Sequence, residues 1–229
     1  FDVFEGQVYP MFDRDIHVID PFPIPKEWER GLCLDHGYRN PTAVVFLAAD
    51  YDGNLYAYNE HYEAGQLVSY HAGRIKGIWG DEHCSPIIDP ACKAGNGING
   101  KSVIDEYRDH EIYCRPGNND VIAGINRVSE YLQLDEITGK PRLFIFRGCE
   151  NLITELQQYK WEKLKPGTDA NEPERPVKTH DHAADALRYF IMSRPQVPVV
   201  PKEETPPIRA DKDRIAKHLG GGRRRSPVF

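Results

Sequence analysis

Two neighbouring stretches, RGLCLDHG at residues 30–37 and TAVVFLAADYDGNLYAYNEHY at residues 42–62, decide the expected fold. The first is a short apolar run that ends in a turn at Gly37, which is typical of a strand. The second has apolar and aromatic runs on either side of Asp52-Gly53, and an Asp-Gly pair in this setting is a strong signal for a β-hairpin. Three successive strands with short connections predict an antiparallel meander.

After the meander, segments with helical spacing alternate with short apolar runs. Helices are expected at residues 66–79, 100–110, 119–134 and 150–162 and from residue 181, and strands at residues 84–91, 111–117 and 141–149. Because strands that alternate with helices pair in parallel, we expect an α/β fold with a mixed central sheet, an antiparallel meander followed by parallel strands flanked by helices. Residues 1–29 are predicted to supply one or two edge strands and a loop that lead into this domain, which extends to residue 194.

The chain of 229 residues has a net charge of −6, but its C-terminal part is basic. Residues 195–229 contain eight Lys or Arg and four Asp or Glu, a net of +4, so the other 194 residues carry −10. An acidic body binds nucleic acid weakly, unless its carboxylates hold cations and its basic groups are locally clustered. The six prolines of residues 195–229 predict a disordered, basic tail.

Other features narrow the class of protein. No apolar run approaches the roughly 18 residues of a membrane span and no signal peptide opens the chain, so we expect no membrane contact. The first residue is Phe, which indicates a fragment of a longer protein. Five scattered cysteines without a C-x-x-C pair favour reduced thiols, and only the adjacent His83 and Cys84 hint at a zinc site.

Four aspartates stand where a strand is expected to end or a helix to begin. Asp35 ends GLCLD and Asp89 ends PIID, and the ligands of open α/β sheets gather beyond the carboxyl ends of strands. The stretch VKTHDHAADALRYF, residues 177–190, places Asp181 and Asp185 four residues apart on one face of a helix. Such acids repel one another unless protons or cations neutralise them, and oxygen-only ligands favour Mg²⁺ or Mn²⁺ over zinc.

Each of these aspartates also has an interpretation in which it does not bind a metal. Asp35 could form an Asx turn, and Asp89 could start a turn. Asp181 could interact with the dipole of the first helical turn, and His182 could be a surface histidine as well as a ligand. Asp185 is harder to explain in this way, because it lies one turn into an apolar helix flanked by small alanines.

The acids on the first and fourth strands and on a late helix resemble those of the ribonuclease H-like nucleases. The chain is most similar to the C-terminal nuclease domain of the large terminase subunit of tailed bacteriophages. The similar segments are GQVYPMF, HVID, LDHGYRNPTA, IIDPA, NDVIAGINRV and HDHAADALRY, which together span residues 6–189. Since no G-x-x-x-x-G-K-[ST] motif is present, the N-terminal ATPase domain of such proteins is expected to lie outside this chain.

The resemblance implies a metal-dependent endonuclease that cuts concatemeric double-stranded viral DNA by two-metal phosphodiester hydrolysis. It implies that Asp35, Asp89 and Asp185 are the catalytic metal ligands, with Asp181 as a further ligand and His182 as a catalytic helper. The expected cations are Mg²⁺ or Mn²⁺, and Asp35 is expected to bridge two of them.

Basic side chains near these acids are expected to contact DNA phosphates, although surface solubility explains them equally well: Arg39, Lys93 and Lys101. The implied partners are double-stranded DNA, the portal protein, the small terminase subunit and the ATPase domain of the full-length protein. The implied location is the cytoplasm of the infected bacterial host. Two alternatives stay open at this point, a resolvase or transposase of the same fold and a domain that mainly docks on the portal or the small subunit.

Overall fold

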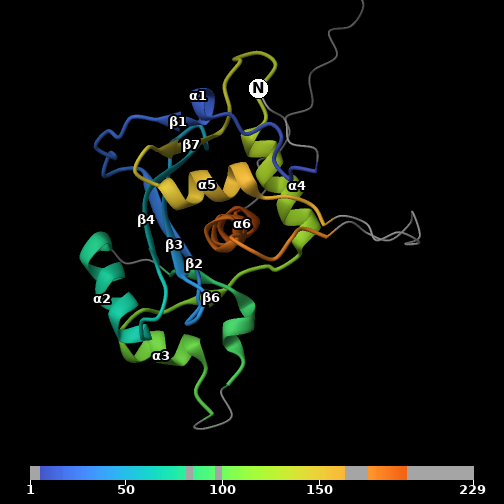
Figure 1. Ribbon diagram of the computed structural model, residues 1–229. Coiled ribbons are helices and arrows are strands. Elements are labelled where there is room, and N and C mark those ends of the chain that lie inside the picture. Colours follow the sequence, from blue (N-terminus) through green and yellow to red (C-terminus); the bar gives the residue numbers. More distant parts are fainter. Residues whose placement is uncertain (1–5, 81–84, 96–99, 163–174, 195–229) are drawn as a thin grey trace, which may run out of the picture. The chain divides into compact units, whose positions relative to one another are not determined.

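A seven-stranded mixed sheet runs through the residues that the computed structural model describes, 6–80, 85–95, 100–162 and 175–194 (Figure 1). Its strands lie in the order β1-β7-β4-β3-β2-β5-β6. Their bounds are β1 (Val18–Ile19), β2 (Glu29–Asp35), β3 (Thr42–Ala49), β4 (Leu55–Glu63), β5 (Ile87–Ile88), β6 (Arg115–Pro116) and β7 (Leu143–Phe146). The His83-Cys84 pair and the tail predicted at residues 195–229 lie outside the described residues.

The strands β2, β3 and β4 form an antiparallel meander at the centre of this sheet. β2 pairs with β3 over its whole length, with Glu29 opposite Ala49 and Asp35 opposite Ala43, and β3 pairs in turn with β4. On one side β5 joins β2 in parallel, and on the other side β7 joins β4 in parallel. The predicted mixed sheet, a meander followed by parallel strands, is therefore confirmed.

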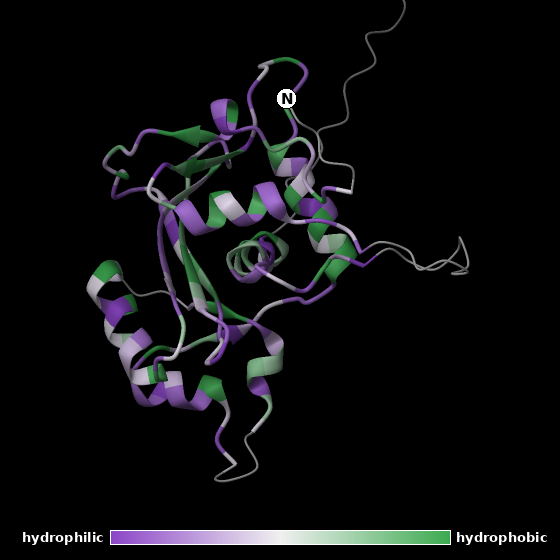
Figure 2. Cartoon of the chain, in the orientation of Figure 1, coloured by the Kyte–Doolittle hydropathy of each residue, from purple (hydrophilic) through white to green (hydrophobic). Residues whose placement is uncertain are grey.

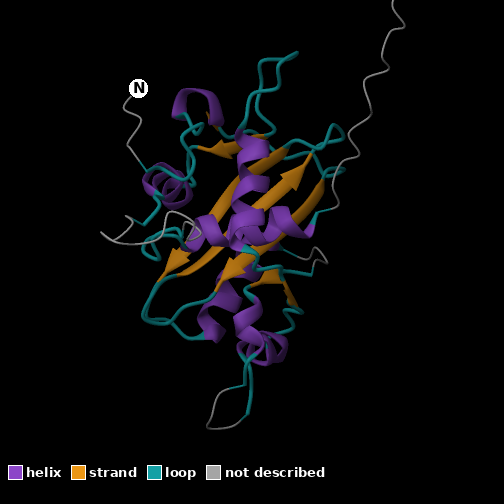
Figure 3. Cartoon of the chain, turned by 90° about the vertical axis from the view of Figure 1, so that its right-hand side faces the viewer, coloured by secondary structure: helices purple, strands orange, loops and turns teal. Residues whose placement is uncertain are grey.

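Helices cover both faces of the sheet (Figures 1 and 3). One face carries α4 (Val121–Leu132), α5 (Glu150–Gln158) and α6 (His182–Ser193), and the opposite face carries α2 (Val68–Trp79) and α3 (Val103–Asp109). Along β2, Cys33 belongs to the core beneath α6, whereas its neighbours Leu32 and Leu34 belong to the core beneath α2. All eight residues of β3 are buried, because both of its faces are covered, and Figure 2 shows the central strands as largely hydrophobic.

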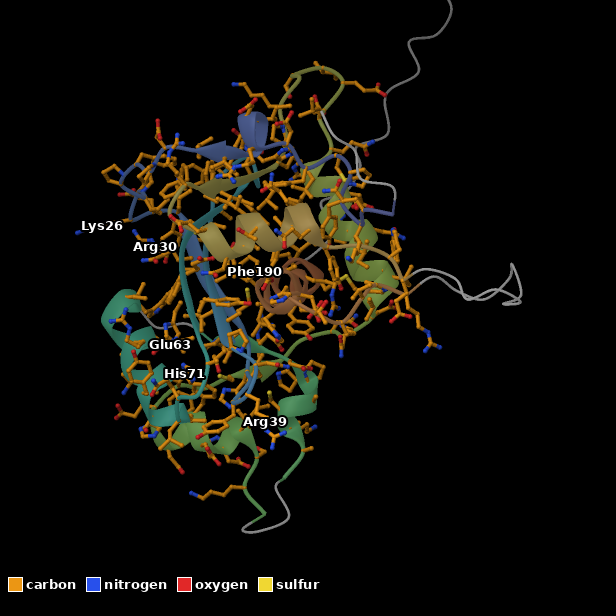
Figure 4. All side chains as sticks on the ribbon, viewed as in Figure 1. Lys26, Arg30, Arg39, Glu63, His71 and Phe190 are labelled. Atoms are coloured by element: carbon orange, nitrogen blue, oxygen red, sulfur yellow. The ribbon has the colours of Figure 1, made fainter. Side chains whose placement is uncertain are left out.

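Small side chains let α6 approach β2 closely. Ala183, Ala184 and Ala186 of the helix are all buried. On the strand, a Cβ added to Gly31 would come within 2.5 Å of Cε2 of Phe190, so only glycine fits beneath this ring (Figure 4). This close packing brings the first turn of α6 to the end of β2.

Among the described residues 6–28, the structure has one edge strand and one element that was not predicted. The strand is β1, which pairs in parallel with β7, and the unpredicted element is the short helix α1 (Arg14–His17). His17 is fully buried, and its Nε2 lies 2.8 Å from the carbonyl oxygen of Leu132. The buried side chain of His17 contacts a residue 115 positions later in the chain. Because such a contact is not visible in the local sequence, this helix was not predicted.

Two simpler properties of the described residues complete the fold. No helix among them has the length and apolar character to cross a membrane. Their four cysteines are free thiols, and Cys33, Cys92 and Cys149 are buried. Burial raises the pKa of Cys33 well above its usual value, so this thiol stays protonated and inert.

Three histidines meet on the α2 side of the sheet. His61 of β4 and His71 of α2 share a hydrogen bond of 2.9 Å between Nε2 and Nδ1, and the ring of His36 lies edge-on to that of His71. Burial, followed by the charge of His71, lowers the pKa of both His36 and His61 to about 4. These rings are therefore neutral near pH 7.

We predict that this cluster makes the fold sensitive to acid. An unfolded histidine binds a proton near pH 6.5, whereas folded His36 and His61 do so only near pH 4. Between these values the unfolded state binds more protons, so stability is full above about pH 6.5 and falls as the pH falls towards 4. The melting temperature of a His61→Gln variant should therefore decline less steeply over this range than that of the native chain.

The matched control is His110→Gln, which removes a histidine at the end of α3, outside the cluster. Its melting temperature should follow the native pH dependence. Parallel curves for the native chain and the His61→Gln variant would contradict the prediction.

Candidate metal centre

Asp35 and Asp89 lie side by side at the carboxyl ends of two parallel strands. Leu34 of β2 is in register with Ile88 of β5, so the acids that follow them occupy equivalent positions. The backbone N–H of Asp89 donates to the carbonyl oxygen of Leu34 at 3.3 Å. The side chain of Asp89 also accepts a hydrogen bond of 2.9 Å from the backbone N–H of Ala91 and caps the 3₁₀ turn η1 (Pro90–Lys93). The turn considered for Asp89 therefore exists, and it holds the acid at the strand end.

Asp35 pairs with His182, the first residue of α6. Nδ1 of His182 donates to Oδ2 of Asp35 at 2.8 Å. Burial raises the pKa of Asp35 above its usual value; the bond from His182 opposes this rise, while the charges of Asp185 and Asp89 add to it. The same hydrogen bond raises the pKa of His182, in spite of its partial burial. Asp89 and Asp185 are thus both close enough to Asp35 to act on its carboxylate electrostatically.

Asp185 is buried and is held by two cations. Arg188 donates to its Oδ1 from Nε at 3.1 Å and from Nη2 at 3.0 Å. Lys178 donates to its Oδ2 at 3.0 Å. The repulsion expected between acids in this helix is offset here, because each oxygen of Asp185 faces a positive charge.

Arg188 is itself fixed from several sides. Its Nη2 donates to Oδ1 of Asn119 at 2.9 Å, and its guanidinium lies over the ring of Tyr189, 4.7 Å from the centroid. Its stem passes over Gly124 of α4, where an added Cβ would meet Cγ of Arg188 at 2.5 Å and Cδ at 2.6 Å. Asn119 and Gly124 both belong to the segment NDVIAGINRV, so this segment supports the late helix rather than binding a metal.

Asp181 stands at the N-cap of α6 without capping it. The backbone N–H groups of Ala183 and Ala184 donate instead to Oε2 of Glu155 from α5, at 2.6 and 2.9 Å. Glu155 therefore makes the interaction with the first helical turn that was considered for Asp181. Asp181 is buried, and its Oδ2 accepts no hydrogen bond, although Nζ of Lys178 lies 3.4 Å away.

The donor set fits a hard divalent cation. It consists of carboxylate oxygens at one edge of the sheet, and the buried, unbonded Oδ2 of Asp181 is an acceptor without a donor. Within the described part of the chain, no three His, Cys, Asp or Glu side chains converge closely enough to hold a metal ion as they stand. Asp35, Asp89 and Asp185 are instead engaged by His182, by the backbone of Ala91 and by the two cations.

The three basic residues expected to contact phosphates lie in different settings. Arg39 is exposed in the loop that follows Asp35 (Figure 4), and Lys93 is exposed at the end of η1. Lys101 instead forms an ion pair with Asp109 of α3, with 2.6 Å between Nζ and Oδ2. Arg39 and Lys93 therefore remain suitable for phosphate contacts, whereas Lys101 is partly neutralised.

Sequence reasoning missed Lys178, Arg188 and Glu155. Arg188 had a detectable signal, because it follows Asp185 by three residues, a spacing that pairs opposite charges on a helix. Lys178 lies before the start of α6, where this helical rule does not apply. Glu155 had no such signal either, since it reaches α6 from a helix 28 residues earlier.

Comparison with known proteins places this geometry in context. The model of the family described as "Terminase RNaseH-like domain" matches residues 32–194. The large terminase subunit of Escherichia phage T5 is 30% identical over 203 residues, which are 84% of this chain and 43% of that protein. The chain therefore spans less than half the length of this curated relative.

Solved structures agree with the fold. The large terminase of a thermophilic bacteriophage matches with a TM-score of 0.68 and 26% identity, over 82% of this chain and 45% of that one. The nuclease domain of the large terminase g2p from bacteriophage SPP1, solved with bound Mn, matches with a TM-score of 0.55 and 16% identity, over 76% of this chain and 93% of that one. The mixed sheet with its flanking helices is thus the ribonuclease H-like fold of terminase nuclease domains.

We predict that Gly124→Ala destabilises the chain, because the added methyl group displaces the buried stem of Arg188. Overpacking of this kind costs about 1–3 kcal/mol of unfolding free energy, measured by urea denaturation. The control is Gly73→Ala in the exposed part of α2, where a Cβ meets nothing within 4 Å. That variant should gain roughly 0.5–1 kcal/mol from helix propensity. If both variants were stabilised equally, the contact between Gly124 and Arg188 would not matter for folding.

Proposed function

The chain belongs to the family of terminase RNase H-like domains, and we propose that it is the metal-dependent endonuclease domain of a viral DNA-packaging terminase. In this proposal it cleaves concatemeric double-stranded DNA in the cytoplasm of the infected bacterial host. The main support is that Asp35 and Asp89 end neighbouring parallel strands and that the charges of Asp89 and Asp185 both act on Asp35. The bound Mn of the SPP1 nuclease domain supports the choice of cation.

We assign Asp35, Asp89 and Asp185 as the residues that hold Mg²⁺ or Mn²⁺, with Asp181 as a further oxygen donor. A pair of such cations, when bound, stabilises charge on the scissile phosphate and lowers the pKa of the attacking water. Hydrolysis adds this water to phosphorus and breaks the bond to the 3′ oxygen. Asp35 would be the central residue that holds the cations, because the charges of both Asp89 and Asp185 act on its carboxylate.

The surrounding residues orient these acids. His182 holds Oδ2 of Asp35 through its Nδ1, and in the protonated form it also balances the charge of this carboxylate. Arg188 fixes Oδ1 of Asp185 and leaves Oδ2 on the side of Lys178. Arg39 and Lys93, each four residues after a proposed ligand, are positioned to contact the phosphates of a bound strand.

The proposed partners follow from the length and charge of the chain. The T5 relative is more than twice as long as the matched segment, so we propose that an ATPase domain precedes this one in the full-length protein. With a net charge of −10 over residues 1–194, the domain by itself should bind DNA weakly. The ATPase domain, the portal and the small terminase subunit are then the proposed means of holding DNA at the site.

Replacing Asp35, Asp89 or Asp185 by asparagine is expected to abolish nicking of plasmid DNA in Mn²⁺. Loss of the carboxylate charge should lower the rate by more than about 100-fold, since even outer-shell partners of metal ligands typically cost 10- to 100-fold. Asp185→Asn should also lower the melting temperature more than Asp89→Asn, because it leaves Arg188 buried without its counter-charge.

The matched control for this series is Asp52→Asn. Asp52 is an exposed acid in the hairpin turn at the far end of β3, so it changes the net charge equally without touching the site. It should cut DNA at the native rate. Near-native cleavage by a folded Asp35, Asp89 or Asp185 variant would remove that residue from the assignment.

The tail at residues 195–229 is expected to be dispensable for the chemistry, because it follows every proposed ligand. A chain truncated after residue 194 should cut plasmid at the native rate when DNA is saturating and Mn²⁺ is present. Truncation removes the net charge of +4 that the tail carries, so DNA binding should weaken, and the loss should be more visible at low salt. Complete loss of cleavage in a folded truncation would place the tail in the active site.

A further inference from the structure

Lys178 bridges two of the acids at the start of α6. Its Nζ lies 3.0 Å from Oδ2 of Asp185 and 3.4 Å from Oδ2 of Asp181. Both carboxylates are buried, with side chains that are 9% and 6% exposed, whereas the side chain of Lys178 is 56% exposed. A lysine with a largely exposed side chain thus contacts two acids that are almost fully buried.

The two cations on Asp185 differ in how firmly they are held. Arg188 is 1% exposed and is fixed by Asn119 and by the ring of Tyr189, so its contact with Oδ1 is permanent. Among the described residues, the side-chain bonds and ion pairs of Lys178 involve only Asp185 and Asp181. A lysine whose side chain is more than half exposed is held less firmly than this buried arginine, because the ammonium is strongly hydrated and its stem is flexible. The Oδ2 of Asp185 is therefore the oxygen that can change its partner.

Asp181 gives a second, independent indication of a ligand. Its Oδ2 is buried and accepts no hydrogen bond, and Glu155 rather than Asp181 caps α6. Because Nζ of Lys178 at 3.4 Å makes no hydrogen bond to it, this desolvated carboxylate oxygen is poorly satisfied, and it suits a divalent cation that draws both acids towards it.

We propose that Lys178 is an internal counter-cation of this centre, which occupies the place of a divalent cation between Asp181 and Asp185 and must be displaced when one binds. The lysine then keeps the paired acids neutralised in the empty site and raises the cation concentration at which the site fills. This proposal rests on the proposed function, since it concerns cation binding by the same acids.

The test is a calorimetric titration of the full chain with MnCl₂ in the absence of DNA. Lys178→Met retains the apolar stem and removes the charge, so Mn²⁺ should bind more tightly by about two- to fivefold, the range that corresponds to one exposed ion pair. The metal-free variant should melt at a lower temperature than the native chain, because Asp181 and Asp185 lose their shared cation. Lys178→Arg keeps the charge and should bind Mn²⁺ with near-native affinity.

The matched control is Lys76→Met, which breaks the exposed pair between Lys76 and Glu111 on the other face of the sheet. It alters the net charge equally and should leave the affinity for Mn²⁺ unchanged. Unchanged or weaker binding by a folded Lys178→Met variant, or equal tightening in Lys76→Met, would overturn the role of Lys178 while native binding still supports the proposed function. Absence of Mn²⁺ binding by the native chain would overturn both.

Discussion

The carboxylate of Glu155 holds the late helix in the place that the rest of the site depends on. It accepts hydrogen bonds from the hydroxyl of Tyr62 and from the first free N–H groups of α6, at Ala183 and Ala184. Burial raises the pKa of Glu155, and these three donors oppose that rise by stabilising the charged form. A buried helix end without such a partner would leave backbone donors unpaired at a large cost. The start of α6 is thereby tied to α5 and to β4.

The same device occurs one helix earlier. Glu60 of β4 accepts from the backbone N–H groups of Asn151 and Leu152 at the start of α5, where the side chain of the N-cap residue Cys149 does not cap the helix. Two helices in succession are therefore capped by glutamates from other elements. This arrangement affects the site directly. Because Glu155 caps α6 from another helix, the side chain of Asp181 does not have to serve as the helix cap.

The centre combines firmly held and exchangeable charges. The ion pair of Asp185 with Arg188 is buried, and such pairs contribute little net stability because both ions lose their hydration. Its value lies in orientation, since a fixed Oδ1 leaves Oδ2 on the open side of the helix. The contacts of Lys178 with Asp181 and Asp185 and of His182 with Asp35 lie nearer to solvent and offset further negative charge. Ligands that repel one another can thus share one edge of a folded sheet.

The meander, the alternation that followed it and the acids at the strand ends were predictable from the sequence, because each depends on neighbours within a few residues. Apolar runs and the Asp-Gly turn indicated β2, β3 and β4, and the alanines around Asp185 indicated a helix that packs on a sheet. Helix α1 was not predictable, nor were the cap at Glu155, the fit of Gly124 beneath Arg188 or the neutralisation of Lys101 by Asp109. Most of these contacts join segments far apart in the chain. Only the register of the strands and the docking of the helices decided them, because those long-range constraints determine which buried charge meets which partner.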